Sequence, residues 1–205
     1  MKPRNFALTA GISYLVIFFA AIFANFFVLE AMQEAPVETI EQQGLMVRFG
    51  VLAFLITAAF DVVVAWALYE LFKEHYLSGL STYFRIIHAG LMGLGVFALF
   101  GSLQMTSARE ILQQIDIFNI IWLIGLFFFG IHLLLLAQIL KRPKFITIFL
   151  SLAGAMYMID TAAHFLLPNY EDYGSILLLL VAVPSVVGEM SLAVWLMVKG
   201  GKTLT

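Results

Sequence analysis

The distribution of apolar residues divides this chain into six long hydrophobic segments separated by short polar ones. The segments cover residues 6–29, 48–72, 83–105, 116–140, 145–167 and 174–198. Each exceeds about 18 residues, the length at which an apolar run indicates a membrane-spanning helix. Strands of membrane barrels need only about 10 residues and alternate polar with apolar positions. Because lipid cannot satisfy free backbone groups, all six segments are expected to be helical.

We therefore predict an all-α, polytopic membrane helix bundle with six transmembrane helices, in which residues 1–205 form a single transmembrane domain. Composition agrees with this fold class. Hydrophobic residues make up 62% of the chain and charged residues 12%, and the mean hydropathy is +1.00. Soluble domains are only about 45–50% apolar. The first segment is longer than the apolar core of a signal peptide, about 7–15 residues, so it is interpreted as a retained span.

Charge and cysteine content exclude several classes of function. The net charge of −2 gives no basis for binding nucleic acid. The chain contains no cysteine, which excludes disulfides, thiolate metal sites and iron–sulfur clusters. The expected partner is therefore the lipid bilayer, and no nucleic-acid partner is expected.

The basic residues predict the orientation of the chain, because positive charge is enriched in cytoplasmic loops. Only Arg48 and Arg109 fall on one side of the six segments. The other side holds Lys2, Arg4, Lys73, Arg85, Lys141, Arg142, Lys144, Lys199 and Lys202. We therefore expect a multi-pass protein of the plasma (inner) membrane with both termini in the cytoplasm. The longest connection, about 30–47, is then external and holds a short amphipathic or irregular segment.

Three carboxylates lie well inside the apolar segments: Asp61, Asp160 and Glu189. A charge at bilayer depth costs about 2.5–3.5 kcal/mol on insertion scales, so such groups are paired, protonated or in contact with a wet cavity. An intramembrane ionisable residue is accordingly a candidate for a functional site. In the last segment, Pro184 precedes Glu189 and is expected to kink the helix.

The polar residues fall into two layers when they are placed by depth at about 1.5 Å per helical residue. The inner layer is predicted to form a ligand-binding site from Asp61, Arg85, His88, His132 and Glu189. A secondary outer cluster contains Tyr157, Asp160 and His164. Arg85 is the expected counter-ion of Glu189, and the alternative is that Arg85 extends to the cytoplasmic headgroups.

Several functions remain open at this point. The first is binding or transport of a small amphiphilic or cationic ligand, as a homodimer if it transports. The second is a membrane-embedded, metal-dependent hydrolase of a lipid-like substrate, with zinc held by His88, His132 and Glu189, although no HExxH motif is present. The third is a haem b or quinone protein with His88 and His132 as axial ligands. The last is a structural or regulatory subunit, which predicts a tight Arg85–Glu189 pair and no cavity.

Several stretches resemble one family. These are DVVVAWALY at 61–69, FRIIHA at 84–89, FFFGIHLLLL at 127–136, LAGAMY at 152–157 and GEMSLAVWLMVKG at 188–200. Together they resemble the domain-of-unknown-function family 4386. The resemblance implies a prokaryotic integral membrane protein with about six spans, and it implies no activity. The family pattern often has an acidic residue where this chain has His88.

Overall fold

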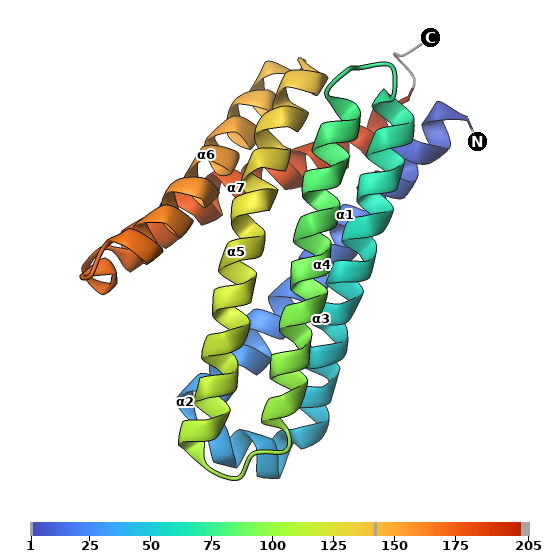
Figure 1. Ribbon diagram of the computed structural model, residues 1–205. Coiled ribbons are helices and arrows are strands. Elements are labelled where there is room, and N and C mark those ends of the chain that lie inside the picture. Colours follow the sequence, from blue (N-terminus) through green and yellow to red (C-terminus); the bar gives the residue numbers. More distant parts are fainter. Residues whose placement is uncertain (1, 142, 202–205) are drawn as a thin grey trace.

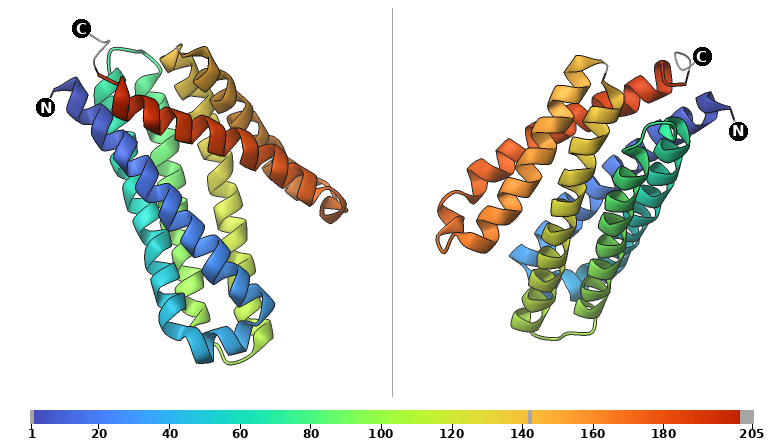
Figure 2. Two further views of the ribbon diagram at one scale, coloured as in Figure 1. Left: turned by 180° about the vertical axis from the view of Figure 1, so that it is seen from behind. Right: turned by 45° about the horizontal axis from the view of Figure 1, so that its top comes forward.

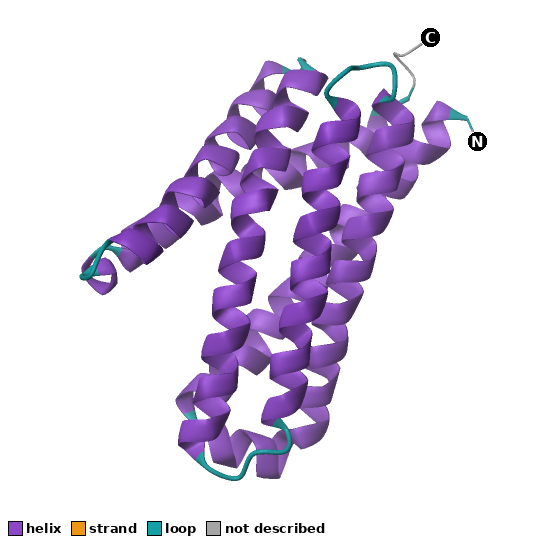
Figure 3. Ribbon diagram, in the orientation of Figure 1, coloured by secondary structure: helices purple, strands orange, loops and turns teal. Residues whose placement is uncertain are grey.

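A computed structural model describes residues 2–141 and 143–201, and Figure 1 shows their arrangement. These residues form helices joined by short loops, with no strand among them (Figure 3). Six helical segments are long and apolar enough to cross a membrane. The predicted fold class, an all-α bundle with six transmembrane helices, is therefore confirmed. Arg142 and Lys202, which were used to predict the orientation, lie outside the described residues.

The first span begins with α1, Pro3–Ile22, and continues through a π-helical stretch, η1, Phe23–Leu29, into the short α2, Glu30–Glu34. The other spans are α3, Pro36–Phe72; α4, Ser78–Ser102; α5, Ala108–Leu140; α6, Lys144–Leu166; and α7, Gly174–Val198. A single 3-10 turn, η2, Tyr170–Asp172, lies between α6 and α7. The long α3 remains helical well beyond the length that is needed to cross the bilayer.

The region 30–47 differs from the expected external loop, because most of it is helical and belongs to α2 and α3. The break between these helices is at Ala35, whose φ of −137° and ψ of 71° are not helical. Pro36 explains the break, since proline disfavours helical geometry in the preceding residue and is well tolerated at the first position of a helix. A second irregularity is at Gln43, with φ −124° and ψ 26°.

The six spans pack in a closed ring in the order of the sequence. Contacts join α1 to α3, α3 to α4, α4 to α5, α5 to α6 and α6 to α7, and α7 returns to α1. Arg4 helps to close the ring, because its Nη1 donates to the carbonyl oxygens of Leu196 and Gly200, both at 2.9 Å, and its Nη2 donates to that of Met197. The carbonyls of Leu196 and Met197 are free groups of the last turn of α7, and that of Gly200 follows the helix; the negative end of a helix favours a cation.

The helices α1 and α7 cross near the end where α1 begins and α7 ends, and they diverge toward the other end (Figure 2). The helices α6 and α7 also diverge from α3, α4 and α5, toward the turn that joins α6 to α7. The side chains that face outward are apolar; for example, Phe97 is 79% exposed, Phe19 65% and Leu178 64%. Such a surface suits hydrocarbon, whereas soluble monomers rarely expose large apolar patches.

The interior contains two apolar clusters, one toward each end of the bundle. One cluster includes Leu68, Leu133 and Leu196, and the other includes Phe54 and Phe118. Along α3, Asp61 lies between Phe54 of one cluster and Val64 of the other. The inner polar layer is therefore enclosed between two apolar regions, where water cannot compensate for an unpaired charge.

Candidate functional site

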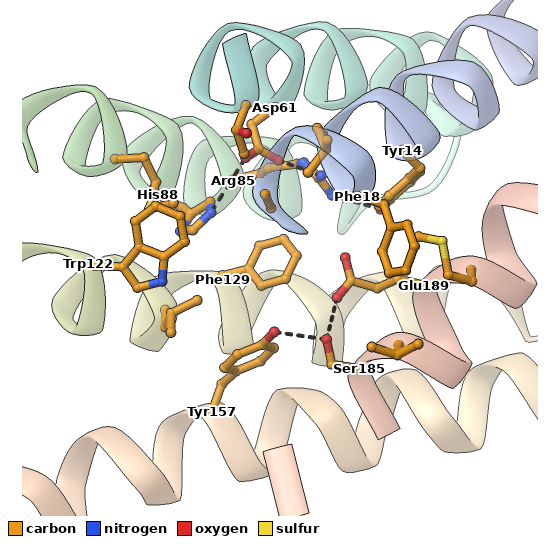
Figure 4. Close-up of a pocket in the computed structure, with 17 residues that line it drawn as sticks. Tyr14, Phe18, Asp61, Arg85, His88, Trp122, Phe129, Tyr157, Ser185 and Glu189 are labelled. Carbon is orange, nitrogen blue, oxygen red and sulfur yellow. Dashed lines mark hydrogen bonds and ion pairs between the residues drawn. The ribbon is translucent and has the colours of Figure 1, made fainter. Parts of the chain in front are cut away.

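A pocket of about 160 Å³ lies in the polar layer at the centre of the ring (Figure 4). All six spans contribute to its wall, and the contributing residues include Tyr14, Phe18, Asp61, Arg85, His88, Trp122, Phe129, Tyr157, Ser185 and Glu189. A cavity of about 150 Å³ can hold a benzene molecule. The pocket therefore has room for one ring or one headgroup of a small ligand.

Asp61 and Arg85 form an ion pair at the wall of this pocket. Arg85 Nη2 donates to Asp61 Oδ1 at 2.5 Å, and both side chains are almost completely buried, with 1% and 3% of their surfaces exposed. Arg85 Nη1 also donates to the hydroxyl of Tyr14 at 2.7 Å. The guanidinium lies over the rings of Tyr14 and Phe129, 4.7 and 5.2 Å from their centroids. Arg85 thus points inward, and its charge is compensated by Asp61 in place of the expected Glu189.

His132 supports Arg85 from behind and does not line the pocket. Its Nε2 lies 3.1 Å from Arg85 Nη1, and because arginine can only donate, this nitrogen must be an acceptor. Its Nδ1 lies 3.0 Å from the carbonyl oxygen of Ser81, which can only accept, so Nδ1 carries the proton. His132 is therefore a neutral imidazole in which both nitrogens are engaged by the protein.

His88 lies on the same face of α4 as Arg85, one turn away. Its Nδ1 lies 2.9 Å from the carbonyl oxygen of Gly125 on α5, so this nitrogen donates. Its Nε2 faces Asp61 Oδ2 at 3.6 Å. A Cβ at Gly125 would lie only 3.3 Å from His88 Nδ1, so the absence of a side chain there makes room for the imidazole. Both of its nitrogens are thus directed at groups of the protein.

Glu189 contributes a carboxylate from the opposite wall. Its Oε1 accepts a hydrogen bond from Ser185 Oγ at 2.8 Å. Because Ser185 donates to Glu189, it accepts from the hydroxyl of Tyr157, which is also 2.8 Å away. Among the described residues, no Lys, Arg or His forms an ion pair with Glu189. The carboxyl group extends toward the middle of the pocket, as Figure 4 shows.

The predicted outer cluster divides into two parts. Tyr157 belongs to the pocket through Ser185, whereas Asp160 accepts a hydrogen bond from the hydroxyl of Tyr170 at 2.8 Å. His164 packs edge-on against the Tyr170 ring, with centroids 4.5 Å apart. Partial burial and the hydrogen bond to Asp160 raise the pKa of Tyr170 to about 12, so its hydroxyl keeps its proton at physiological pH. This contact fixes the turn between α6 and α7.

The two histidines proposed to bind zinc or haem, His88 and His132, already contact other groups of the protein. Within residues 2–141 and 143–201, no group of three or more His, Asp or Glu side chains is placed to hold a metal ion. The ring of Phe129 packs against both His88 and His132, at centroid distances of 4.7 and 5.8 Å. Because the nitrogens of His132 are already engaged, this histidine could bind iron or zinc only after leaving Arg85 and Ser81.

Several pocket residues were not predicted from the sequence. Ser185 lies four residues before Glu189, a spacing that places both on one face of a helix, so this pair could have been found. Tyr14 and Phe129 gave no comparable signal, because an aromatic residue in an apolar span is common. Trp122 also lines the pocket, although a tryptophan in a membrane span is more commonly an interfacial residue.

The fold and the enclosed polar layer define a polytopic helical membrane protein with an intramembrane pocket. Residues 9–200 match the family model described as Domain of unknown function (DUF4386), and the chain belongs to this family. An uncharacterised protein of Archaeoglobus fulgidus is 27% identical over 160 residues, which cover 75% of this chain and 85% of that protein. No solved structure matches the chain.

Proposed function

We propose that this protein binds a small amphiphilic or cationic molecule in its intramembrane pocket. The observation that carries this proposal is the position of Glu189, a carboxylate without a basic partner among the described residues, at the wall of a cavity of about 160 Å³. Glu189 is half-buried. A polar group kept from water is costly unless it is satisfied, and a ligand in the cavity would satisfy it. Aromatic and apolar side chains around a few polar groups are typical of small-molecule sites.

A route between α1 and α7 would let the ligand enter from the bilayer. Both helices contribute partly exposed residues to the pocket, namely Ile17, Phe18 and Ala21 on α1 and Val186 and Met190 on α7. The same two helices diverge on leaving their crossing point (Figure 2). A molecule that partitions into lipid would therefore reach the pocket without crossing an aqueous phase. The plasma membrane and cytoplasmic termini belong to this proposal, as does a homodimer if the protein transports its ligand.

A structural or regulatory role would not require these features. That alternative predicts an Arg85–Glu189 pair and no cavity, whereas Arg85 pairs with Asp61 and the pocket lies between them and Glu189. The geometry therefore favours ligand binding over a purely structural subunit. A metal-dependent hydrolase has less support, because His132 is already engaged by Arg85 and Ser81.

Trp122 provides a direct test of binding, since it lines the pocket. The other two tryptophans can be removed by Trp66→Phe and Trp195→Phe. This single-tryptophan protein, in lipid nanodiscs, would be titrated with benzyltrimethylammonium, with its uncharged isostere neopentylbenzene and with phenylmethanesulfonate. We expect at least one probe to change the Trp122 emission saturably.

The matched control separates the pocket from the surrounding lipid. Ala21→Phe adds a ring at the pocket wall and should abolish the saturable change, whereas Ile12→Phe, on the lipid-facing side of the same helix, should preserve it. If none of the three probes produces a saturable change, or if both variants behave alike, the protein does not bind small molecules in this pocket.

A further inference from the structure

Two of the charged groups around the pocket have an ionic partner within the described residues, and Glu189 has none. This difference indicates what kind of ligand the pocket binds. Arg85 and Asp61 compensate each other directly, at 2.5 Å. Glu189 receives one hydrogen bond, from the neutral Ser185, and no basic side chain of the described residues pairs with it. A carboxylate in a low-dielectric site that lacks a counter-ion is costly. A proton or a cation in the pocket would remove that cost.

The pocket walls favour an organic cation over a metal ion. Phe129, Tyr157 and Trp122 present aromatic rings to the same cavity, and aromatic faces attract ammonium groups within about 6 Å. A hard metal ion needs about six oxygen ligands. The described part of the chain contains no cluster of His, Asp and Glu side chains that could supply them, and Glu189 is the carboxylate that extends toward the middle of the pocket.

An anionic ligand is disfavoured for the opposite reason. Most of the guanidinium donors of Arg85 already make hydrogen bonds within the protein: Nη1 donates to Tyr14 and to His132, and Nη2 donates to Asp61. Only Nε has no hydrogen-bond partner among the described residues. Two N–H groups of Arg85 therefore remain, that of Nε and the second one of Nη2, and an anion that reached them would approach the carboxylate of Glu189.

We propose that a lipophilic organic cation and a proton compete for Glu189, so that each cation bound displaces one proton to solvent. This inference rests on the proposed function and specifies its ligand. The other ionisable groups at the polar layer are Tyr14 on α1, Asp61 on α3, Arg85 and His88 on α4, His132 on α5 and Tyr157 on α6. The basic groups among them already contact other groups of the protein. Arg85 pairs with Asp61, His88 faces Asp61 and donates to the Gly125 carbonyl, and His132 contacts Arg85. Glu189 is therefore the group at which the cation and the proton replace each other.

The test uses the same single-tryptophan protein and compares the probes with one another. Benzyltrimethylammonium and neopentylbenzene have nearly the same shape and differ in charge. At pH 8 we expect the cation to bind at least about tenfold more tightly, a typical effect of one ionic contact and an aromatic site. Glu189→Gln should remove this preference by weakening binding of the cation, and the saturable change with neopentylbenzene should persist, which shows that the variant is folded.

The pH dependence identifies the competing proton. A proton on Glu189 opposes the cation, so the cation affinity should fall as the pH falls, by up to about tenfold per unit for a single competing proton. In weakly buffered solution, cation binding should release protons, and Glu189→Gln should release none. His164→Asn, which changes a histidine outside the pocket, serves as the control and should retain both the pH dependence and the proton release.

Three results would overturn the inference while ligand binding itself still stood. The first is equal affinity for the cation and neopentylbenzene, and the second is tighter binding of phenylmethanesulfonate. The third is a pH dependence of cation binding that persists in Glu189→Gln. If all three probes fail to bind, the proposed function itself is wrong.

Discussion

At the scale of single residues, the Asp61–Arg85 pair has the largest expected effect on stability. Removing one member of a buried ion pair leaves the other charge uncompensated, which costs about 3–5 kcal/mol. Both side chains are almost completely buried. We therefore expect Asp61→Asn and Arg85→Gln each to lower the free energy of unfolding by about that amount. Unfolding in mixed micelles with increasing denaturing detergent would measure the change.

The double variant and a neighbouring residue provide the controls. Asp61→Asn combined with Arg85→Gln removes both charges, so its cost should be smaller than the sum of the single costs. Tyr14→Phe removes only a neutral acceptor from Arg85 Nη1, at 2.7 Å, and should cost about 1 kcal/mol. Additive single costs would mean that the two side chains do not act as a pair.

The sequence predicted which ionisable residues meet, but it did not predict their partners. Helical spacing and depth were enough to place Asp61, Arg85, His88, His132 and Glu189 in one polar layer. Whether Arg85 pairs with Asp61 or Glu189 depends on the rotation of three helices about their axes, which the apolar pattern of lipid-facing spans does not determine. Ser185 was within reach of a spacing argument, whereas Tyr14 was not, because its role depends on how α1 packs against the rest of the bundle.

At the scale of helices, α5 and α6 approach each other closely at Gly130 and Gly154. A Cβ at either glycine would lie 2.6 Å from the carbonyl oxygen of the other. Gly130→Ala should therefore destabilise the protein by about 1–3 kcal/mol, as overpacking usually does. The free energy of unfolding would be measured as for the ion pair.

Gly90 on α4 is the matched control, since no heavy atom lies within 4 Å of a Cβ built there. Gly90→Ala should be neutral or stabilising by up to about 1 kcal/mol, because alanine favours the helix. Equal destabilisation by both substitutions would show that helix propensity and not packing determines the effect at Gly130.

The helices themselves were well predicted, and the exceptions have local causes. The end of α7 at Val198 and of α5 at Leu140 coincide with the ends of the apolar runs. The region 30–47 was expected to be a loop because it is polar, but polarity only places it outside the hydrocarbon. A polar segment can still be helical, and Pro36 merely restarts the helix after the break at Ala35.

At the scale of the whole molecule, the orientation in the membrane can be tested because the chain has no cysteine. Glu171 and Lys73 lie at opposite ends of the spans, in the connection between α6 and α7 and just after α3. In intact cells, a membrane-impermeant maleimide should label Glu171→Cys and should label Lys73→Cys only after lysis, since basic residues favour the cytoplasm. The reverse pattern would mean that the termini face outward.

The closed ring also has a consequence for biogenesis. The ion pair joins α3 and α4, which are adjacent in the chain, so the ribosome delivers both partners early. Glu189 and Ser185 are on α7 and emerge last. A nascent chain paused after α6 would already hold Arg85 and Asp61 together, yet it would lack one wall of the pocket and would be open to lipid along that side. The last helix to be inserted is thus the one that completes the wall of the pocket.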